Sequence, residues 1–222
     1  MTFINIHTHQ AQPEGIVGIT NVFLQDYAAD GRAAKGLFSL AIHPWHVLQL
    51  KDEVQELLEL LEKAATHPDM AALGETGLDK ASEAPWRLQK QFFGMQAHLA
   101  QRLQKPMIIH CVRAWQEIMA YRKNHQDAAP WIIHGFTGSK QLARQLVDEG
   151  FYLSFGAALV KGHQKTIESL LQVGAEHIFM ETDDEQISIE TVYANAAGHL
   201  GVSVSHLQQI IFESFNKLFK TY

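Results

Sequence analysis

The sequence has little cysteine and no long hydrophobic run. Its 222 residues include one cysteine, Cys111, so no disulfide can form within the chain. A single thiol suits a reducing compartment, and we therefore expect a cytoplasmic protein without a disulfide-linked partner. A strand-like run begins at Thr2 and leaves no room for a signal peptide. No apolar segment approaches the roughly 20 residues that a membrane-spanning helix needs, so we expect no membrane partner.

An excess of positive charge is also missing. The chain has 18 basic and 24 acidic residues and a formal net charge of −6. It therefore lacks the basic surface by which many proteins hold nucleic acid independently of sequence. Hydrophobic residues make up 46% and charged residues 19% of the chain, which excludes a disordered protein and favours one globular domain spanning residues 1–222.

Histidine, by contrast, is frequent, with thirteen in the chain. Two of them close similar segments, PMIIHC with His110 and PWIIHG with His134. A short apolar run without polar alternation is typical of a strand that is buried on both faces. Either the histidines are scattered polar residues, or some of them share one site.

Strand-like and helix-like segments alternate along the chain. The strand-like segments are residues 3–7, 16–23, 37–43, 70–75, 107–110, 131–134, 151–155 and 177–183. Apolar residues at helical spacing mark residues 51–65, 84–103, 139–150 and 203–219. Gly150 is expected just after the third of these helices, and Ser203 or Ser205 is the expected N-cap of the last. The alternation predicts an α/β fold with a parallel sheet, most simply a compact (β/α)8 TIM-type barrel.

The first three strands fit this barrel poorly. Only eight residues separate His7 from Ile16, whereas a parallel crossover needs about a dozen or more. We therefore expect strands two and three to form a hairpin-like substitute. The barrel is then distorted or incomplete around strands one to three.

Nearly every strand ends in a histidine or a carboxylate. Because the carboxyl ends of parallel strands meet on the face that carries the active site of a barrel, these residues are expected around one mouth. His7 and His9 are two residues apart, so an extended backbone projects both side chains from the same face. The expected set is His7, His9, Glu75, His110, His134 and Asp183.

Imidazole nitrogens and carboxylate oxygens are ligands for zinc, manganese or magnesium. One such residue alone is more often a satisfied polar side chain, but burying the whole set without partners or metal would be costly. The set has no cysteine, which argues against a closed structural zinc site. It exceeds the needs of one tetrahedral ion, so we expect two divalent ions about 3.5–4 Å apart, bridged by a carboxylate and a hydroxide.

These residues also resemble a known family. The blocks INIHTH, AIHP, LGETGLD, PMIIHC, IIHGFTGS, METD and FNKLF run nearly end to end. Together they resemble the TatD-family metal-dependent hydrolases, often described as TatD-type deoxyribonucleases, a branch of the amidohydrolase-like barrels. The resemblance implies a metal-dependent hydrolase that cleaves phosphodiester bonds, with DNA as the expected partner.

The resemblance also implies a role for each residue. The expected ligands are His7, His9 and Asp183 for one ion and His110 and His134 for the other, with Glu75 bridging the two. Asp183 would also take a proton from the attacking water, so Asp183 and Glu75 are the expected catalytic residues. His43 would lie near the substrate phosphate; the alternative is a strand-end histidine braced by Pro44.

Three features depart from the family pattern. Asn5 stands where the family usually has aspartate in DxHxH, so it can hydrogen bond beside the ligands but supplies no negative charge. The segment METDDEQISIE is acidic where the family is commonly basic, and Asp184 and Glu185 would repel a polyanion if they faced the mouth. The chain is also short against the family, with the first helix apparently lost.

Two residues after the fifth strand are candidate substrate contacts. Arg113 could clamp a phosphate oxygen, and Trp115 could stack on a base. The alternative is an ion pair at a helix start and a packed indole.

Two rival functions stay open. The acidic charge suggests a metal-dependent hydrolase of a small phosphoester, amide or ester. Asn5 suggests a barrel kept as a non-catalytic metal-binding scaffold. The oligomeric state is not readable from the sequence.

Overall fold

The structure, a computed structural model, describes residues 2–30 and 35–219. The chain divides into two compact units. Unit 1 consists of Met1–Thr20 and Ile132–Tyr222, and unit 2 consists of Asn21–Trp131. The assignment of residues 1–222 to a single domain stays a prediction.

The described residues contain eight strands that follow one another in the sheet in chain order. Their bounds are β1 Phe3–Thr8, β2 Ile16–Phe23, β3 Phe38–Ala41, β4 Met70–Asp79, β5 Met107–Val112, β6 Trp131–Ile133, β7 Phe151–Phe155 and β8 Ile178–Met180. The pairs β1–β2, β3–β4, β4–β5 and β7–β8 are parallel. Parallel strands alternating with helices give a fold of the (β/α)8 TIM-barrel class, which confirms the predicted fold class.

Helices connect most of these strands. Their bounds are α1 Leu24–Asp30, η1 Pro44–His46 (a single 3₁₀ turn), α2 Val54–Ala64, α3 Trp86–Leu103, α4 Trp115–Lys123, α5 Lys140–Asp148, α6 Ala157–Val160, α7 Gln164–Val173, α8 Ile189–Leu200 and α9 Val204–Phe219. The apolar spacing predicts α2, α3, α5 and α9. It does not mark α1, α4, α6 and α7, or α8, which is rich in alanine. None of the described helices has both the length and the hydropathy of a membrane span.

The helix ends follow the predicted capping residues. Ser203 is the N-cap of α9, because its hydroxyl accepts a hydrogen bond from the backbone N–H of His206 at 3.2 Å. Gly150 follows α5 with a φ of +83°, a left-handed conformation that glycine adopts without steric cost. Both predictions are confirmed.

The connection between β1 and β2 corrects one expectation. The two strands pair in parallel, with Phe3 opposite Ile16 and Thr8 opposite Thr20, although no helix joins them. An extended return of eight residue steps can cover about 26–29 Å, whereas a six-residue strand spans only about 20 Å. The crossover minimum applies to helical connections, so the inference from the short spacing was wrong. The expected hairpin between strands two and three is replaced by α1. The predicted irregularity is present as a register shift between Asn5 and Thr8.

Gly18 in β2 makes room for this return segment. A Cβ atom on Gly18 would lie 2.3 Å from Cγ of Gln12. The side-chain oxygen of Gln12 in turn accepts a hydrogen bond from the amide of Asn5 in β1 at 2.9 Å. The absence of a side chain at Gly18 therefore lets Gln12 cross β2 and reach β1.

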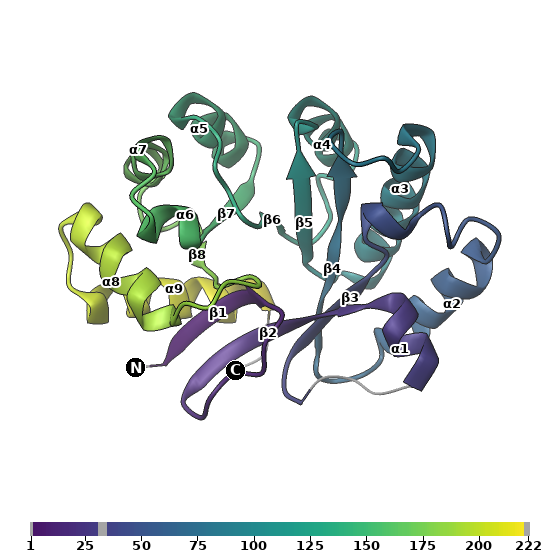
Figure 1. Ribbon diagram of the computed structural model, residues 1–222, viewed down its shortest axis with the longest axis horizontal. Helices are drawn as coiled ribbons and strands as arrows, with labels where there is room; N and C mark the ends of the chain where they lie inside the picture. The colour runs from purple at the N-terminus through teal and green to yellow at the C-terminus, as the bar shows by residue number, and fades with distance from the viewer. Residues whose placement is uncertain (1, 31–34, 220–222) are drawn as a thin grey trace. The chain divides into compact units, whose positions relative to one another are not determined.

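In unit 1, α8 and α9 pack against β1 (Figure 1). The buried hydroxyl of Tyr193 in α8 donates a hydrogen bond to the carbonyl of Ile4 at 3.1 Å and accepts one from its N–H at 3.3 Å. Burial raises the pKa of Tyr193. These bonds tie α8 to the strand that carries His7.

In unit 2, α3 packs against β4. Gln96 of α3 is buried, and its amide donates to the carbonyl of Ile42 at 3.1 Å and to the hydroxyl of Thr76 at 2.8 Å. Its oxygen accepts from the N–H of Ile42 at 2.7 Å. One glutamine therefore fixes the backbone next to His43 and the side chain of Thr76, the neighbour of Glu75.

Candidate metal centre

A first cluster lies in unit 1 at the ends of β1 and β8. The Nε2 atoms of His7 and His9 each lie 3.4 Å from the same oxygen, Oδ1 of Asp183. The His7 side chain is fully buried, whereas those of His9 and Asp183 are 28% and 37% exposed. Solvent can therefore reach this carboxylate while one of its imidazole partners is shielded.

Backbone hydrogen bonds hold the cluster in place. The N–H of Asp183 donates to the carbonyl of His7, and the N–H of His9 donates to the carbonyl of Asp183, both at 3.1 Å. Asp183 has a φ of +53°, a left-handed conformation that aspartate tolerates better than most residues. The turn after β8 thus aims this carboxylate at the two histidines.

His134, directly after β6, belongs to the same cluster. The rings of His7 and His134 have centroids 4.4 Å apart. One potential ligand atom from each of His7, His134 and Asp183 lies within 4.8 Å of the others. Glu181 lies next to His134. Its Oε1 accepts a hydrogen bond from the N–H of Gly135 at 2.7 Å and lies 3.8 Å from Nδ1 of His134.

The electrostatics of this cluster favour an ionised Asp183. Burial is the largest single influence and would raise the pKa of its carboxyl group, but the contacts with His7, His9 and His134 together outweigh burial. The nearby imidazoles of His7 and His134 act in the same direction. The pKa of Asp183 therefore lies well below its usual value, and the group is an anion at neutral pH.

A second cluster lies in unit 2 and combines Glu75 of β4, His110 of β5 and His43, which follows β3. Oε1 of Glu75 is 2.8 Å from Nδ1 of His110 and 3.3 Å from Nε2 of His43. One potential ligand atom from each of these residues lies within 4.8 Å of the others. Glu75 and His43 are buried and His110 is nearly so, so the cluster is shielded from water.

His43 faces Glu75 as a neutral donor. Its Nδ1 accepts a hydrogen bond from the backbone N–H of Trp45 at 3.2 Å, which leaves the ring proton on Nε2, next to Glu75. Burial lowers the pKa of His43 despite the neighbouring carboxylate. His43 therefore orients Glu75 by a hydrogen bond in this arrangement.

His110 lies between two carboxylates, and this geometry fits a bound cation. Its Nδ1 meets Glu75, and its Nε2 lies 3.2 Å from Oδ2 of Asp79. A neutral imidazole has one N–H, so it can donate to only one of two acceptors. If the N–H is on Nε2 and donates to Asp79, the lone pair on Nδ1 faces the Glu75 oxygen and repels it. A divalent ion bound to both atoms would relieve this repulsion. The carboxylate–histidine–metal arrangement is common in metal sites.

The other predicted residues lie as follows. Arg113 is exposed and has a left-handed φ of +55° just after β5, and Trp115 is half-buried at the start of α4. The predicted pairing of His110 with His134 and the bridging role of Glu75 stay predictions. The predicted substrate contacts of His43, Arg113 and Trp115 stay predictions too.

Asn5 is buried, and among the described residues its side chain bonds to Gln12 and Thr182 rather than to the clustered imidazoles. Its amide nitrogen donates to Gln12 and to the hydroxyl of Thr182, each at 2.9 Å, and its oxygen accepts from the N–H of Thr182 at 3.1 Å. Asn5 therefore holds the backbone next to Asp183. Two of these three bonds need an amide N–H, which aspartate lacks.

Sequence reasoning missed Asp79 and Glu181. The predicted strand ended at residue 75, whereas β4 continues to Asp79. Glu75 and Asp79 are four residues apart in β4 and so share one face of the strand. Glu181 and Asp183 are two residues apart in the predicted strand 177–183, where the same rule would place them on one face. The same period-two rule that joined His7 to His9 could have found both residues.

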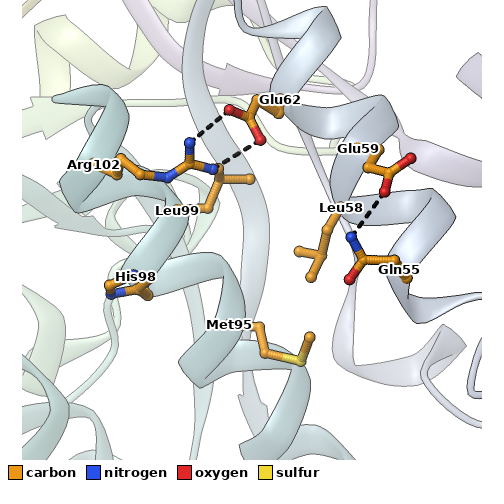
Figure 2. A pocket seen from close by; sticks show the side chains of 8 residues that line it. All are labelled: Gln55, Leu58, Glu59, Glu62, Met95, His98, Leu99 and Arg102. Atoms are coloured by element: carbon orange, nitrogen blue, oxygen red, sulfur yellow. Dashed lines mark hydrogen bonds and ion pairs between the residues drawn. The ribbon is translucent and has the colours of Figure 1, made fainter.

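A pocket of about 300 Å³ between α2 and α3 holds no comparable cluster (Figure 2). Its Arg102 is engaged by both oxygens of Glu62, at 2.6 and 2.8 Å. The remaining lining comes from helix side chains such as Leu58 and Met95, and no strand end contributes to it. This pocket is therefore not the candidate centre.

A smaller pocket of about 160 Å³ adjoins the first cluster. Asp183, Asp184 and Glu185 all line it. Glu185 also forms an ion pair with Lys161, so part of this negative charge is neutralised. The acidic segment after β8 thus borders the candidate centre in unit 1.

Comparisons with known proteins agree on one family. The family described as TatD related DNase matches residues 8–220. An uncharacterized metal-dependent hydrolase, YabD of Bacillus subtilis, is 32% identical over 149 residues, which cover 66% of this chain and 58% of the relative. YcfH of Escherichia coli K12, with the same description, is 28% identical over 200 residues, which cover 82% of this chain and 73% of the relative. The chain therefore spans about three fifths of the length of the YabD relative.

Solved structures share the fold. The crystal structure of YJJV, a TatD homologue from Escherichia coli K12, superposes with a TM-score of 0.81 at 21% identity and covers 98% of both chains. A TatD-family hydrolase from Entamoeba histolytica gives a TM-score of 0.80 at 15% identity, over 100% of this chain and 99% of the other. With the family match, these findings show that the chain belongs to the TatD related DNase family.

Proposed function

We propose that this protein is a metal-dependent hydrolase that cleaves phosphodiester bonds, with DNA as its substrate. The observation that carries the proposal is the environment of His110, whose ring nitrogens both face buried carboxylates. That arrangement favours a divalent cation at Nδ1, beside Glu75. The lone thiol, Cys111, supports a cytoplasmic location.

Two divalent ions, zinc, manganese or magnesium, would be held by residues of the two clusters. The proposed ligands are His7, His9 and Asp183 for one ion and His110 and His134 for the other, with Glu75 shared between them. When bound, such ions lower the pKa of water and polarise a phosphoryl oxygen. The nitrogen and oxygen donors fit all three metals, and no thiolate selects for zinc.

Asp183 is the proposed acceptor of the proton from the attacking water. It is ionised, it is partly exposed to solvent, and the hydrogen bonds of the turn after β8 fix its direction. His43 keeps Glu75 oriented through its Nε2–H. Arg113, exposed after β5, is the proposed contact for a non-bridging phosphate oxygen.

An activity panel on metal-stripped protein tests the proposal. Zinc, manganese or magnesium is restored in turn, and hydrolysis of labelled single-stranded DNA is measured for wild type, Glu75→Ala and Asp183→Ala. We expect metal-dependent cleavage by wild type and a loss of about 1,000-fold or more in both variants. Asp148→Ala, on the exposed face of α5, is the control and should keep full activity. Full metal-dependent activity in either site variant would contradict the assignment.

A small phosphoester is the second candidate substrate. The pocket lined by Asp183, Asp184 and Glu185 is acidic and small, which suits a compact substrate better than a polyanion. Small phosphate esters, carboxylic esters and amides therefore belong in the same panel. Turnover of these esters without DNA cleavage would favour the small substrate, and metal binding without any turnover would favour a non-catalytic scaffold.

A further inference from the structure

A pocket of about 630 Å³ in unit 2 opens beside Asp79. The loop after β4 forms one side of it, and the segment that contains Trp45 and Leu48 forms the other. Asp79 contributes both to this pocket and to the second cluster, where it contacts His110. A group bound in the pocket would therefore lie next to the candidate centre. The volume is typical of sites for small molecules.

The pocket collects apolar side chains that are unusually exposed. Among the described residues, three large hydrophobic side chains are exposed: Trp45 at 54%, Leu48 at 46% and Leu171 at 52%. Two of the three line this one pocket. A single exposed leucine needs no explanation, but an indole and a leucine gathered beside a candidate active site indicate a binding surface.

The indole of Trp45 is held in a fixed position. Its Nε1–H donates to Oδ2 of Asp79 at 2.7 Å, and Oδ1 of Asp79 accepts from the backbone N–H of Ala81 at 2.8 Å. The rings of His43 and His110 meet the indole at interplanar angles of 79° and 78°, so neither imidazole stacks on it. A fixed aromatic face binds a planar ligand with little loss of side-chain entropy.

The charge of the lining selects the kind of ligand. Besides Asp79, the polar lining comes from Gln49, Ser82 and Glu83, and none of the described residues that line the pocket is basic. The nearby Lys80 is paired with Glu117 at 2.6 Å. A phosphate would meet carboxylates here, whereas an uncharged ring with an amino group could stack on Trp45 and donate to Glu83 or Gln49.

We propose that this pocket is a subsite for a nucleobase of the substrate, stacked on the indole of Trp45 next to the phosphoester that is hydrolysed. The link between this subsite and catalysis rests on the proposed function. It transfers the base-stacking role that the sequence suggested for Trp115 to a tryptophan that is exposed beside the candidate centre. Adenine and cytosine, which carry exocyclic amino groups, fit the acidic lining best.

Two substrates with the same leaving group test the subsite. One is the 4-nitrophenyl ester of adenosine 5′-monophosphate, and the other is methyl 4-nitrophenyl phosphate, which lacks the base. In Trp45→Ala, we expect the ratio of kcat/KM for the adenosine ester to that for the methyl ester to fall about tenfold, as expected for one lost stacking contact. Leu171→Ala removes a similarly exposed side chain in α7 and should leave the ratio unchanged.

Trp45→Phe separates stacking from support of Asp79. Phenylalanine keeps an aromatic face but loses the N–H that donates to Asp79. We expect this variant to keep most of the preference for the adenosine ester. If Trp45→Ala and Trp45→Phe lower kcat/KM for both esters equally, Trp45 acts only by orienting Asp79 and His110, and the subsite is refuted.

Adenosine binding gives a readout that does not depend on hydrolysis. The nucleoside is titrated into the full chain, and binding is followed by NMR chemical-shift changes in wild type and in Trp45→Ala. Binding that Trp45→Ala weakens about tenfold supports the subsite even if no ester is hydrolysed, in which case only the proposed function fails. If adenosine binds both proteins equally or neither, the subsite fails while the proposed function is untouched.

Discussion

At the scale of single residues, Asn5 and Asp79 show how buried polar groups position the candidate ligands. Neither was predicted as a ligand, yet Asn5 holds the backbone beside Asp183, and Asp79 contacts the ring of His110. Buried polar groups normally form hydrogen bonds, so replacing one of them leaves the donors and acceptors that it contacted unsatisfied. Both residues can therefore be tested by substitutions that keep their shape.

Asn5→Asp should destabilise the protein, although the family usually has aspartate at this position. The carboxylate cannot donate to Gln12 or to Thr182, and it places a charge in a fully buried site. We expect a loss of about 1–3 kcal/mol in the free energy of unfolding, measured by urea titration at pH 7. Asn195→Asp, at a half-buried position in α8, is the control and should cost less than about 0.5 kcal/mol. A variant as stable as wild type would contradict the assigned role.

Asp79→Asn should weaken metal binding without unfolding the chain. The contacts of Asp79 with Trp45 and His110 lower the pKa of its carboxyl group although burial opposes this, so it acts as an anion toward the imidazole. The amide removes that charge, and we expect the affinity for a divalent ion to fall about 10- to 100-fold in calorimetry. Asp148→Asn is the matched surface control. Unchanged affinity would mean that Asp79 serves only to cap the loop after β4.

The candidate ligands were more predictable from the sequence than the residues that hold them in place by hydrogen bonds. His7, Glu75 and His110 close apolar runs in the sequence, and His9 follows His7 by two residues, so the local pattern marks all four. The supports of these residues come from hydrogen bonds between distant segments, such as Asn5 with Thr182, 177 residues apart. No local pattern encodes such a partner.

At the scale of helices and strands, close contact between β4 and β5 depends on Gly77. A Cβ atom there would lie 1.9 Å from the backbone oxygen of His110. Because that atom belongs to the neighbouring strand, a side chain could fit only if the two strands separated. The sequence motif GETGLD therefore serves packing as well as chemistry.

Gly77→Ala and Gly198→Ala should have opposite effects on stability. Gly77→Ala forces β4 and β5 apart and should lower the free energy of unfolding by about 3 kcal/mol or more. Gly198 lies in α8 with nothing within 4 Å of an added Cβ, so alanine should stabilise the helix by about 0.5–1 kcal/mol. Urea titration of both variants measures the difference. A Gly77→Ala variant with wild-type stability would contradict the packing of β4 on β5.

Elements were predictable where the local pattern was strong. The bounds of β2 and β7 agree with the apolar runs, and α9 agrees with its apolar stripe. The return from β1 to β2 was not foreseen, because it depends on the glycine at position 18 and on Gln12 lying across the strand. A short connection looks the same in the sequence whether it forms a hairpin or an extended return.

At the scale of the whole molecule, each unit carries one cluster of candidate ligands. Unit 1 holds His7, His134 and Asp183, and unit 2 holds His43, Glu75 and His110. In each cluster, carboxylate oxygens and imidazole nitrogens approach within 3.4 Å. Divalent ions that bind only the folded chain should therefore stabilise it.

Metal loading should raise the melting temperature. At an ion concentration 100 times the dissociation constant, binding adds about 2.7 kcal/mol to the free energy of unfolding. For a chain of this length, that corresponds to a rise of about 5–10 °C. Differential scanning calorimetry of stripped and reloaded protein measures the shift, with a chelator as the control. An unchanged melting temperature at saturating ion would argue against binding to the folded state.

The number of metal ions bound per chain tests the central claim most directly. Elemental analysis of reloaded and desalted protein should find two divalent ions in wild type. It should find one in Asp183→Ala, which breaks the first cluster, and one in His110→Ala, which breaks the second. Wild-type protein that retains no ion, or variants that both retain two, would contradict the account.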